Sequence, residues 1–323
     1  MLASRSRLWL AAIVSVVLLG GVLTLSSRAR FQAQTAAVVA IRYALAPSLP
    51  ASHRSDASMV IVTALVLPTH AGAHRHDVAA YLLSVERIMA LVPYPIVFYG
   101  SPELELDVRR WRGARAIEFR PVLDVFDVLP IKALGGLDWA VHQAELDETW
   151  TDLAPTTYAA WTAKTYWMSE VGQRHPNSLL AWVDAGSLQD HSVYTLVYPL
   201  WDLALYADRA EAALRDSPAD TMLVFQVTGD GWLQAGSAVG SAKAWRWFNE
   251  AALDAVRAHT DLELHAGREE AIWSYVQRRN RHRVAVVKAD EATSGCHPDV
   301  WKRWAQWATR ESCVIPIEAP LEV

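Results

Sequence analysis

The chain has 323 residues, of which 52% are apolar and 20% are charged. This length and composition allow one large domain or two small ones with a sizeable core, and they exclude a disordered chain. The formal net charge of −5 gives no broad cationic surface, which argues against a nucleic-acid partner. Two cysteines, Cys296 and Cys313, are too few for a disulfide scaffold or a four-cysteine zinc site. The sequence leaves two alternatives for this pair: one disulfide, or two buried thiols.

The N-terminal segment predicts a membrane anchor. Arg5 and Arg7 precede an uncharged apolar run over 8–25, which is long enough to cross a bilayer core of ~30 Å as a helix. No clean small-residue cleavage site follows, so a signal anchor is favoured over the alternative, a cleaved secretory signal. We expect a cytosolic tail over 1–7, a transmembrane segment over 8–25 and a stem over 26–57. This single-pass, type II layout places the body in the Golgi or ER lumen, or outside the cytoplasm of a bacterium.

The first part of the body alternates strand and helix patterns. A nearly continuous apolar run at 59–67 predicts a strand buried on both faces, and Asp77 can cap the helix that follows it. Short strands at 95–99 and 116–119 flank a helix that begins near Pro102. This order predicts an α/β fold with a mostly parallel, Rossmann-like central sheet flanked by helices.

The second part of the body continues the pattern after a less regular segment. Residues 121–155 predict a loop with one helix at about 138–148, and the glycine-rich stretch 229–240 predicts another loop. Further elements are expected as helices at 156–174, 241–259 and 268–279, and as strands at 179–183, 221–227 and 283–287. We place the folded domain at 58–295 and a C-terminal extension at 296–323.

Asp184 and Gly186 follow the apolar strand 179–183. They are therefore expected at the carboxyl edge of the sheet, where open α/β sheets bind ligands. There Asp184 can hold a divalent cation, Mg²⁺ or Mn²⁺, that bridges the phosphates of a nucleotide-sugar, and glycine lets the backbone approach closely. The structural alternative is a strand-end Asp that caps the next turn.

Three further carboxylates are candidates for catalysis. Asp230, between two glycines, can position an acceptor hydroxyl or act as a base, although the same sequence forms ordinary turns. Glu269 and Glu270 begin a predicted helix, where they can bind an acceptor or serve as a general base. The alternative is that these two glutamates only interact favourably with the helix dipole.

Three other residues are candidates for binding phosphate. Gly236 and Gly240 precede a helix and can present backbone N–H groups to a phosphate or a sugar. Lys164 lies within a predicted helix beside three aromatic residues. Its ammonium can contact a diphosphate, or it can simply extend to solvent.

Together these segments resemble the HtrL/YibB family, a glycosyltransferase-like group of the GT-A type. The resemblance spans about 58–290 and rests on Ile61-Val-Thr-Ala64, Tyr94-Pro-Ile-Val-Phe-Tyr-Gly100, Trp161-Thr-Ala-Lys-Thr-Tyr-Trp167, Ala181-Trp-Val-Asp-Ala-Gly186, the glycines of 236–240 and Gly267-Arg-Glu-Glu270. It implies a nucleotide-sugar fold with Asp184 at the metal- and nucleotide-associated position and Lys164 near the donor phosphates. It also implies that Glu269 or Glu270 lies on the acceptor side.

The chain departs from the pattern of many GT-A enzymes at one position. Gly186 stands where those enzymes have a second Asp, which removes one potential metal ligand and leaves Asp190 as a substitute. We expect a membrane-anchored hexosyl- or related transferase that moves a sugar from a nucleotide-sugar donor to a glycan or glycoconjugate acceptor.

Two alternatives stay open for this chain. A non-catalytic carbohydrate-binding or scaffold protein on the same fold is one of them. The other is a lumenal hydrolase, which requires two of four carboxylates to face each other within about 5–10 Å. Those four are Asp184, Asp230, Glu269 and Glu270.

Overall fold

The structure is a computed structural model that describes residues 59–68, 78–150, 153–188, 204–229, 231–291, 296, 307 and 313–321. The expected tail, anchor and stem, together with Asp190 and Asp230, lie outside these residues. Within the described part of the chain, no helix combines the length and the apolar character needed to cross a membrane.

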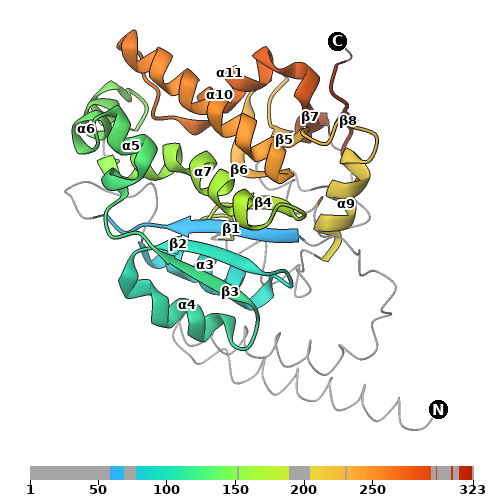
Figure 1. Ribbon diagram of the computed structural model, residues 1–323, viewed down its shortest axis with the longest axis horizontal. Helices are drawn as coiled ribbons and strands as arrows, with labels where there is room; N and C mark the ends of the chain where they lie inside the picture. Colours follow the sequence, from blue (N-terminus) through green and yellow to red (C-terminus); the bar gives the residue numbers. More distant parts are fainter. Residues whose placement is uncertain are drawn as a thin grey trace. The chain divides into compact units, whose positions relative to one another are not determined.

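An eight-stranded sheet forms the centre of the body, in the order β3-β2-β1-β4-β6-β5-β7-β8 (Figure 1). Its strands are β1 (Met59–Leu65), β2 (Ile96–Gly100), β3 (Ile117–Pro121), β4 (Leu179–Val183), β5 (Met222–Gln226), β6 (Leu233–Gly240), β7 (Val284–Lys288) and β8 (Ile317–Glu318). The strands at the centre of this order are apolar and almost completely buried, as expected for strands covered on both faces.

The sheet is mostly parallel, as predicted, and its two reversed strands are β6 and β8. Strands β3, β2, β1 and β4 run parallel to one another, and β5 runs parallel to β7. Strand β6 is antiparallel to both β4 and β5, and β8 is antiparallel to β7. The short connection 227–232 joins β5 to β6 as a hairpin, closed by the bond from Val227 N to Trp232 O (2.9 Å). A short link of this kind allows only antiparallel pairing.

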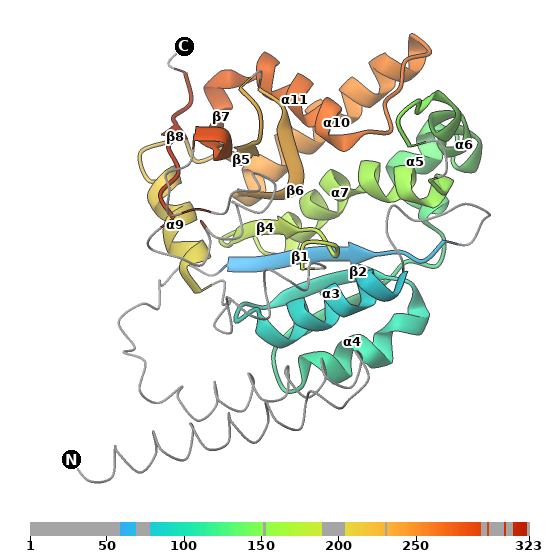
Figure 2. The ribbon, with the colours of Figure 1, turned by 180° about the vertical axis from the view of Figure 1, so that it is seen from behind.

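Helices cover the sheet on both sides (Figures 1 and 2). Helix α3 packs against α4 beside β2 and β3, whereas α7, α10 and α11 pack together on the opposite side. The helices are α3 (Val78–Leu91), α4 (Glu105–Arg112), α5 (Leu129–Leu134), α6 (Leu137–Leu146), α7 (Pro155–Arg174), α9 (Ala204–Leu214), α10 (Ala242–Asp261) and α11 (Glu269–Arg279), with short 3₁₀ turns at η3 (Pro102–Leu104), η4 (Val125–Asp127), η5 (Arg281–Arg283) and η6 (Ala289–Glu291). The fold is therefore α/β, with a central sheet flanked by helices.

Two loop predictions are wrong. The segment 121–155 contains α5 and η4 in addition to the one predicted helix, which is α6. Of the glycine-rich stretch 229–240, residues 233–240 form β6, because their backbone pairs with β4 on one side and with β5 on the other. The small residues of β6 leave room for bulky neighbours, since Ala238 pairs with Trp182.

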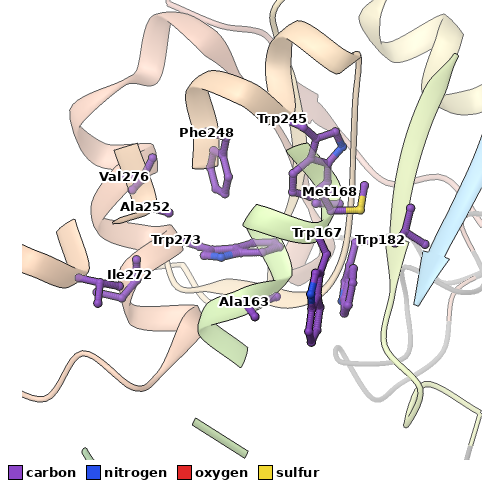
Figure 3. Close-up of a cluster of buried hydrophobic side chains, with 14 of the residues drawn as sticks. Ala163, Trp167, Met168, Trp182, Trp245, Phe248, Ala252, Ile272, Trp273 and Val276 are labelled. Atoms are coloured by element: carbon purple, nitrogen blue, oxygen red, sulfur yellow. The ribbon is translucent and has the colours of Figure 1, made fainter. Parts of the chain in front are cut away.

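Tryptophans fill the core between the sheet and the α7, α10 and α11 helices (Figure 3). Trp182, Trp245 and Trp273 are almost completely buried. The ring of Trp273 meets Phe248 edge-on with centroids 5.2 Å apart, and Trp182 stacks with Trp167 at 6.5 Å. Large aromatic rings bury much apolar surface, so this cluster fixes α7, α11 and β4 relative to one another.

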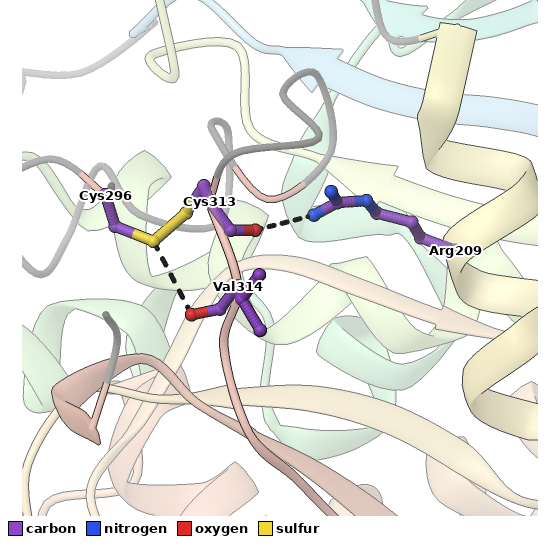
Figure 4. The surroundings of a disulfide bond; sticks show 4 residues. All are labelled: Arg209, Cys296, Cys313 and Val314. Carbon is purple, nitrogen blue, oxygen red and sulfur yellow. Dashed lines mark hydrogen bonds between the residues drawn. A yellow bond between two sulfur atoms is a disulfide. The ribbon is translucent and has the colours of Figure 1, made fainter. Parts of the chain in front are cut away.

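The two cysteines form a disulfide that ties down the C-terminal segment (Figure 4). Arg209 of α9 donates a hydrogen bond to the carbonyl of Cys313 (2.9 Å). The ring of Trp307 packs edge-on against Phe225 of β5, with centroids 5.5 Å apart. Because β8 also pairs with β7, the C-terminal extension contributes the last strand of the same sheet.

Candidate functional site

The strand order reverses between β1 and β4. From β1 the chain continues outward to β2 and β3, and it returns through α7 to β4 on the other side of β1. Open α/β sheets bind ligands at the carboxyl ends of the strands beside such a reversal. Asp184 follows the last residue of β4 and therefore lies at this position.

Several contacts fix Asp184. Its backbone N–H donates to Gly236 O of β6 (2.9 Å), and its carbonyl accepts from Ser187 N (2.9 Å). The indole Nε1 of Trp182 donates to Asp184 Oδ1 (2.7 Å). Trp182 and Asp184 are two residues apart along an extended chain, so their side chains leave the same face. Sequence reasoning gave Trp182 no role of its own, but this spacing is a signal that could have found it.

The turn after Asp184 is anchored by α3. Leu188 N donates to Ser84 Oγ (2.8 Å), and Leu188 O accepts a hydrogen bond from the buried Arg87. The partly exposed Gly186 lies within this turn. The contacts described for the Asp184 side chain come from Trp182 and Lys164, so capping of the next turn does not explain its position.

Lys164, Asp184 and Glu269 meet in one group, which we call the Lys164 cluster. The ammonium of Lys164 lies 2.7 Å from Asp184 Oδ1 and 2.5 Å from Glu269 Oε1, to which it donates. Glu269 Oε2 is also 2.5 Å from the ammonium. The side chains of Lys164 and Glu269 are 5% and 4% exposed, whereas that of Asp184 is 31% exposed. Asp184 is therefore the member of the cluster that is partly exposed to solvent.

The elements around the cluster explain why these residues meet. Lys164 projects from the middle of α7, which leads directly into β4, and Glu269 begins α11. The loop before α11 is held by Gln143, whose Oε1 accepts from Ala266 N (2.6 Å) and Gly267 N (3.0 Å). A Cβ on Gly267 would lie 2.5 Å from Tyr158 Cδ1, so only glycine lets this loop approach α7.

Burial and charge act in opposite directions on the cluster. Burial alone lowers the pKa of the Lys164 ammonium, but the carboxylates of Asp184 and Glu269 outweigh it, so that the pKa is raised. Burial raises the pKa of Glu269 well above its usual range. Lys164 opposes this rise, whereas the nearby charges of Asp184 and Glu270 add to it. Lys164 is therefore charged at neutral pH, and Glu269 takes up a proton more readily than an exposed glutamate.

Glu270 lies beside the cluster and is 7% exposed. Its Oε2 atom makes no hydrogen bond to the described residues, while its backbone carbonyl accepts from Ser274 Oγ (2.6 Å). Both glutamates are thus buried in the first turn of α11.

The two glycines proposed for phosphate binding lie on the same strand, β6, which has Gly236 near its middle and Gly240 at its end. Gly236 is beside Asp184, and a Cβ there would be 3.4 Å from Asp184 Oδ2. Gly240 pairs with Leu180 near the amino end of β4, and a Cβ there would be 2.6 Å from Met222 Sδ. The structure therefore brings Gly236 but not Gly240 to the Lys164 cluster.

Among the described residues, the carboxylates at Asp184 and Glu269 already contact an ammonium, and the candidate ligand Asp190 lies outside those residues. The described residues contain no group of three or more His, Cys, Asp or Glu side chains that could hold a metal ion. Mg²⁺ requires oxygen ligands at about 2.0–2.1 Å in an octahedral arrangement. The position that such an ion would share between Asp184 and Glu269 is filled by the ammonium of Lys164.

Sequence reasoning missed a group of aromatic residues around Arg268, the residue that precedes Glu269 of the Lys164 cluster. The guanidinium of Arg268 stacks over Trp150 at 4.2 Å from the ring centroid, and Trp150 lies 5.8 Å from Trp161. The buried Asp147 accepts from Tyr158 OH (3.1 Å) and lies 3.8 Å from Arg268. These contacts join residues far apart in sequence, which no local pattern reveals.

A hollow of about 710 Å³ lies at the end of the sheet away from the Lys164 cluster. Its lining includes Asp216, Asp220, Arg283, Ile317 and Leu321. It contains the ion pair of Asp220 with Arg283 (2.5 Å), which is about one-third exposed. Strands β5 and β7 begin there, so it lies at their amino ends, away from the position that such sheets use for ligands. The Lys164 cluster is therefore the stronger candidate site.

No protein-family model matches the chain, and no curated protein matches it. Among solved structures, the chain is similar to that of mouse xyloside xylosyltransferase 1 in its apo form. The TM-score is 0.43 and the sequence identity 8%, over 71% of this chain and 84% of that chain. At this level the likeness assigns neither a reaction nor a ligand to this chain.

Proposed function

We propose that the chain is a glycosyltransferase of the GT-A type, related to the HtrL/YibB family. It transfers a sugar from a nucleotide-sugar donor to a glycan or glycoconjugate acceptor. The observation that carries this proposal is the Lys164 cluster, a buried ammonium between two carboxylates at the carboxyl end of β4, where the strand order reverses. That is where an open α/β sheet holds a nucleotide-containing ligand.

The chemistry of the cluster suits such a substrate. Asp184 is the partly exposed carboxylate, and it accepts hydrogen bonds from hydroxyl groups of the donor. Glu270, and Asp230 outside the described residues, are the proposed general bases that take the proton of an acceptor hydroxyl if the reaction inverts the sugar. Glu269 remains a further candidate for the base, although its carboxylate is held by Lys164.

The hydrolase alternative is less well supported. In a paired-carboxylate hydrolase, the two groups face each other across space that holds substrate or water. Asp184 and Glu269 instead share one ammonium, at 2.7 Å and 2.5 Å. The other alternative is a non-catalytic carbohydrate-binding protein on the same fold, which the glycine at position 186 favours.

We further propose that the N-terminal segment 8–25 anchors the protein in a membrane, with its body in the Golgi or ER lumen or outside a bacterial cytoplasm. The Cys296–Cys313 disulfide supports this placement, since such bonds form and persist in oxidising compartments.

Thermal unfolding of the full chain in detergent tests the proposed function. A nucleotide-sugar at a hundredfold excess over its Kd stabilises the folded state by ~2.7 kcal/mol. We expect one nucleotide-sugar, or its nucleoside diphosphate, to raise the Tm of the wild type. Asp184→Ala should abolish the shift, whereas the exposed Asp216→Ala at the opposite edge should retain it. No shift with any nucleotide, together with a shift from free glycans, would favour the carbohydrate-binding alternative.

A further inference from the structure

We propose that Lys164 is the resident cation of this site, so that ligands bind at Asp184 without a divalent metal ion. We also infer that Asp184 recognises hydroxyl groups of a sugar or ribose instead of a metal-bound diphosphate. The second inference rests on the proposed function, whereas the first rests on the geometry of the Lys164 cluster alone.

The ammonium is built into the core. Lys164 emerges from the buried face of α7, and its ammonium lies 5.4 Å from the ring centroid of Trp182. The same ammonium contacts carboxylates from β4 and α11. An aromatic face and two carboxylates are all favourable surroundings for a cation. The contacts of the ammonium therefore come from residues of separate segments, Trp182 of β4, Asp184 after β4 and Glu269 of α11.

The charge balance also favours lysine over a metal ion. Taking a carboxylate out of water is costly unless a partner compensates it. The side chain of Glu269 is 4% exposed, and among the described residues the ammonium of Lys164 lies 2.5 Å from its carboxylate. Displacing Lys164 with a divalent ion would leave a buried ammonium without its two partners. A metal ion must therefore compete with an interaction that the fold itself provides.

The contacts of Asp184 point to hydroxyl recognition. Both Trp182 Nε1 and Lys164 Nζ contact the same carboxylate oxygen, Oδ1, at 2.7 Å. Oδ2 lies toward Gly236, where a Cβ would be 3.4 Å from this oxygen and 3.3 Å from Gln234 Nε2. A carboxylate oxygen accepts hydrogen bonds and donates none, so it attracts O–H groups and repels phosphate oxygens. Sugar and ribose hydroxyls are the matching ligand groups.

Mn²⁺ binding tests the first inference without any sugar ligand. The electron paramagnetic resonance signal of free Mn²⁺ is titrated with wild-type protein, Lys164→Met and the double variant Lys164→Met/Glu269→Gln. We expect no binding by the wild type and a gain of at least about tenfold in Mn²⁺ affinity for Lys164→Met, because two carboxylates then lose their ammonium. The double variant should lose most of this gain. Mn²⁺ binding by the wild type that Asp184→Asn abolishes would overturn the inference.

A second measurement covers the case in which Lys164→Met does not fold. Nucleotide-sugar stabilisation of the wild type is measured in EDTA and again in Mn²⁺, and we expect equal shifts in Tm. A shift that appears only with Mn²⁺ would overturn metal independence while supporting the proposed transferase. No shift under either condition would count against the transferase and against hydroxyl recognition, and the Mn²⁺ titration of the wild type would still decide the role of Lys164.

Discussion

Lys164 donates a 2.5 Å hydrogen bond to Glu269 across 105 residues of sequence, and both side chains are almost completely buried. Because burial raises the pKa of Glu269, the folded state binds its proton more tightly than the unfolded state does. The stability from this group is therefore complete below its ordinary pKa of 4.5 and is lost as the pH rises toward the folded value.

We expect Glu269→Gln to remove this pH dependence. The free energy of unfolding of the wild type, minus that of the variant, should fall by up to ~1.4 kcal/mol per pH unit above pH 4.5. Urea unfolding at several pH values between 4.5 and 8 measures the difference. The exposed Glu103→Gln is the matched control and should give a curve parallel to that of the wild type. A constant difference between Glu269→Gln and the wild type would contradict the raised pKa.

Trp182→Phe should weaken ligand binding at Asp184. The variant keeps an aromatic ring in the core but loses the Nε1 donor that orients Asp184 Oδ1. Trp245→Phe is the matched control, since its Nε1 donates to Leu180 O (2.9 Å) in the same strand, away from Asp184. Both variants should lose about 1–3 kcal/mol of stability. Only Trp182→Phe should reduce the nucleotide-sugar shift in Tm. Equal reductions in both variants would indicate a general loss of core packing.

Gly236→Ala should mainly reduce ligand affinity, whereas Gly240→Ala should mainly reduce the stability of the fold. A Cβ at Gly236 meets Asp184 Oδ2 at ordinary contact distance, so the variant should fold but hinder a ligand at that oxygen. A Cβ at Gly240 lies 2.6 Å from Met222 Sδ and 2.9 Å from Ala244 Cβ, and overpacking of this kind costs about 1–3 kcal/mol. Urea unfolding measures the stability of both variants, and ligand titration measures their affinity. An unaltered ligand affinity in Gly236→Ala would contradict the prediction.

Much of the fold could be predicted because its elements have local signals. The apolar run of β1 and the strand before Asp184 were recognisable from composition alone, and both lie at the centre of the sheet. Strand β6 could not be predicted in this way. Its Ala and Gly residues have low strand propensity, and what makes it a strand is pairing on both sides around Trp182.

The candidate site was predictable as a set of residues but not as an arrangement. Strand-end position identified Asp184, and helix-start position identified Glu269. Neither signal indicates that Lys164 lies between them, because that contact depends on how α7 and α11 pack around Trp273. Sequence reasoning therefore considered Lys164 and Asp184 separately, whereas the structure brings the ammonium to within 2.7 Å of Asp184 Oδ1.

Loss of the Cys296–Cys313 disulfide should destabilise the body and release its C-terminal segment. The bond joins residues 17 apart, and a loop of that size predicts a contribution of about 3 kcal/mol through the unfolded chain. Cys313 is fully buried and its carbonyl accepts from Arg209, so Cys296→Ser combined with Cys313→Ala leaves that backbone contact possible. Urea unfolding should show a lower free energy of unfolding for the double variant. Dithiothreitol should lower the stability of the wild type to a similar value and leave the variant unchanged. Equal stability of oxidised wild type and variant would show that β8 and Trp307 hold the segment without the disulfide.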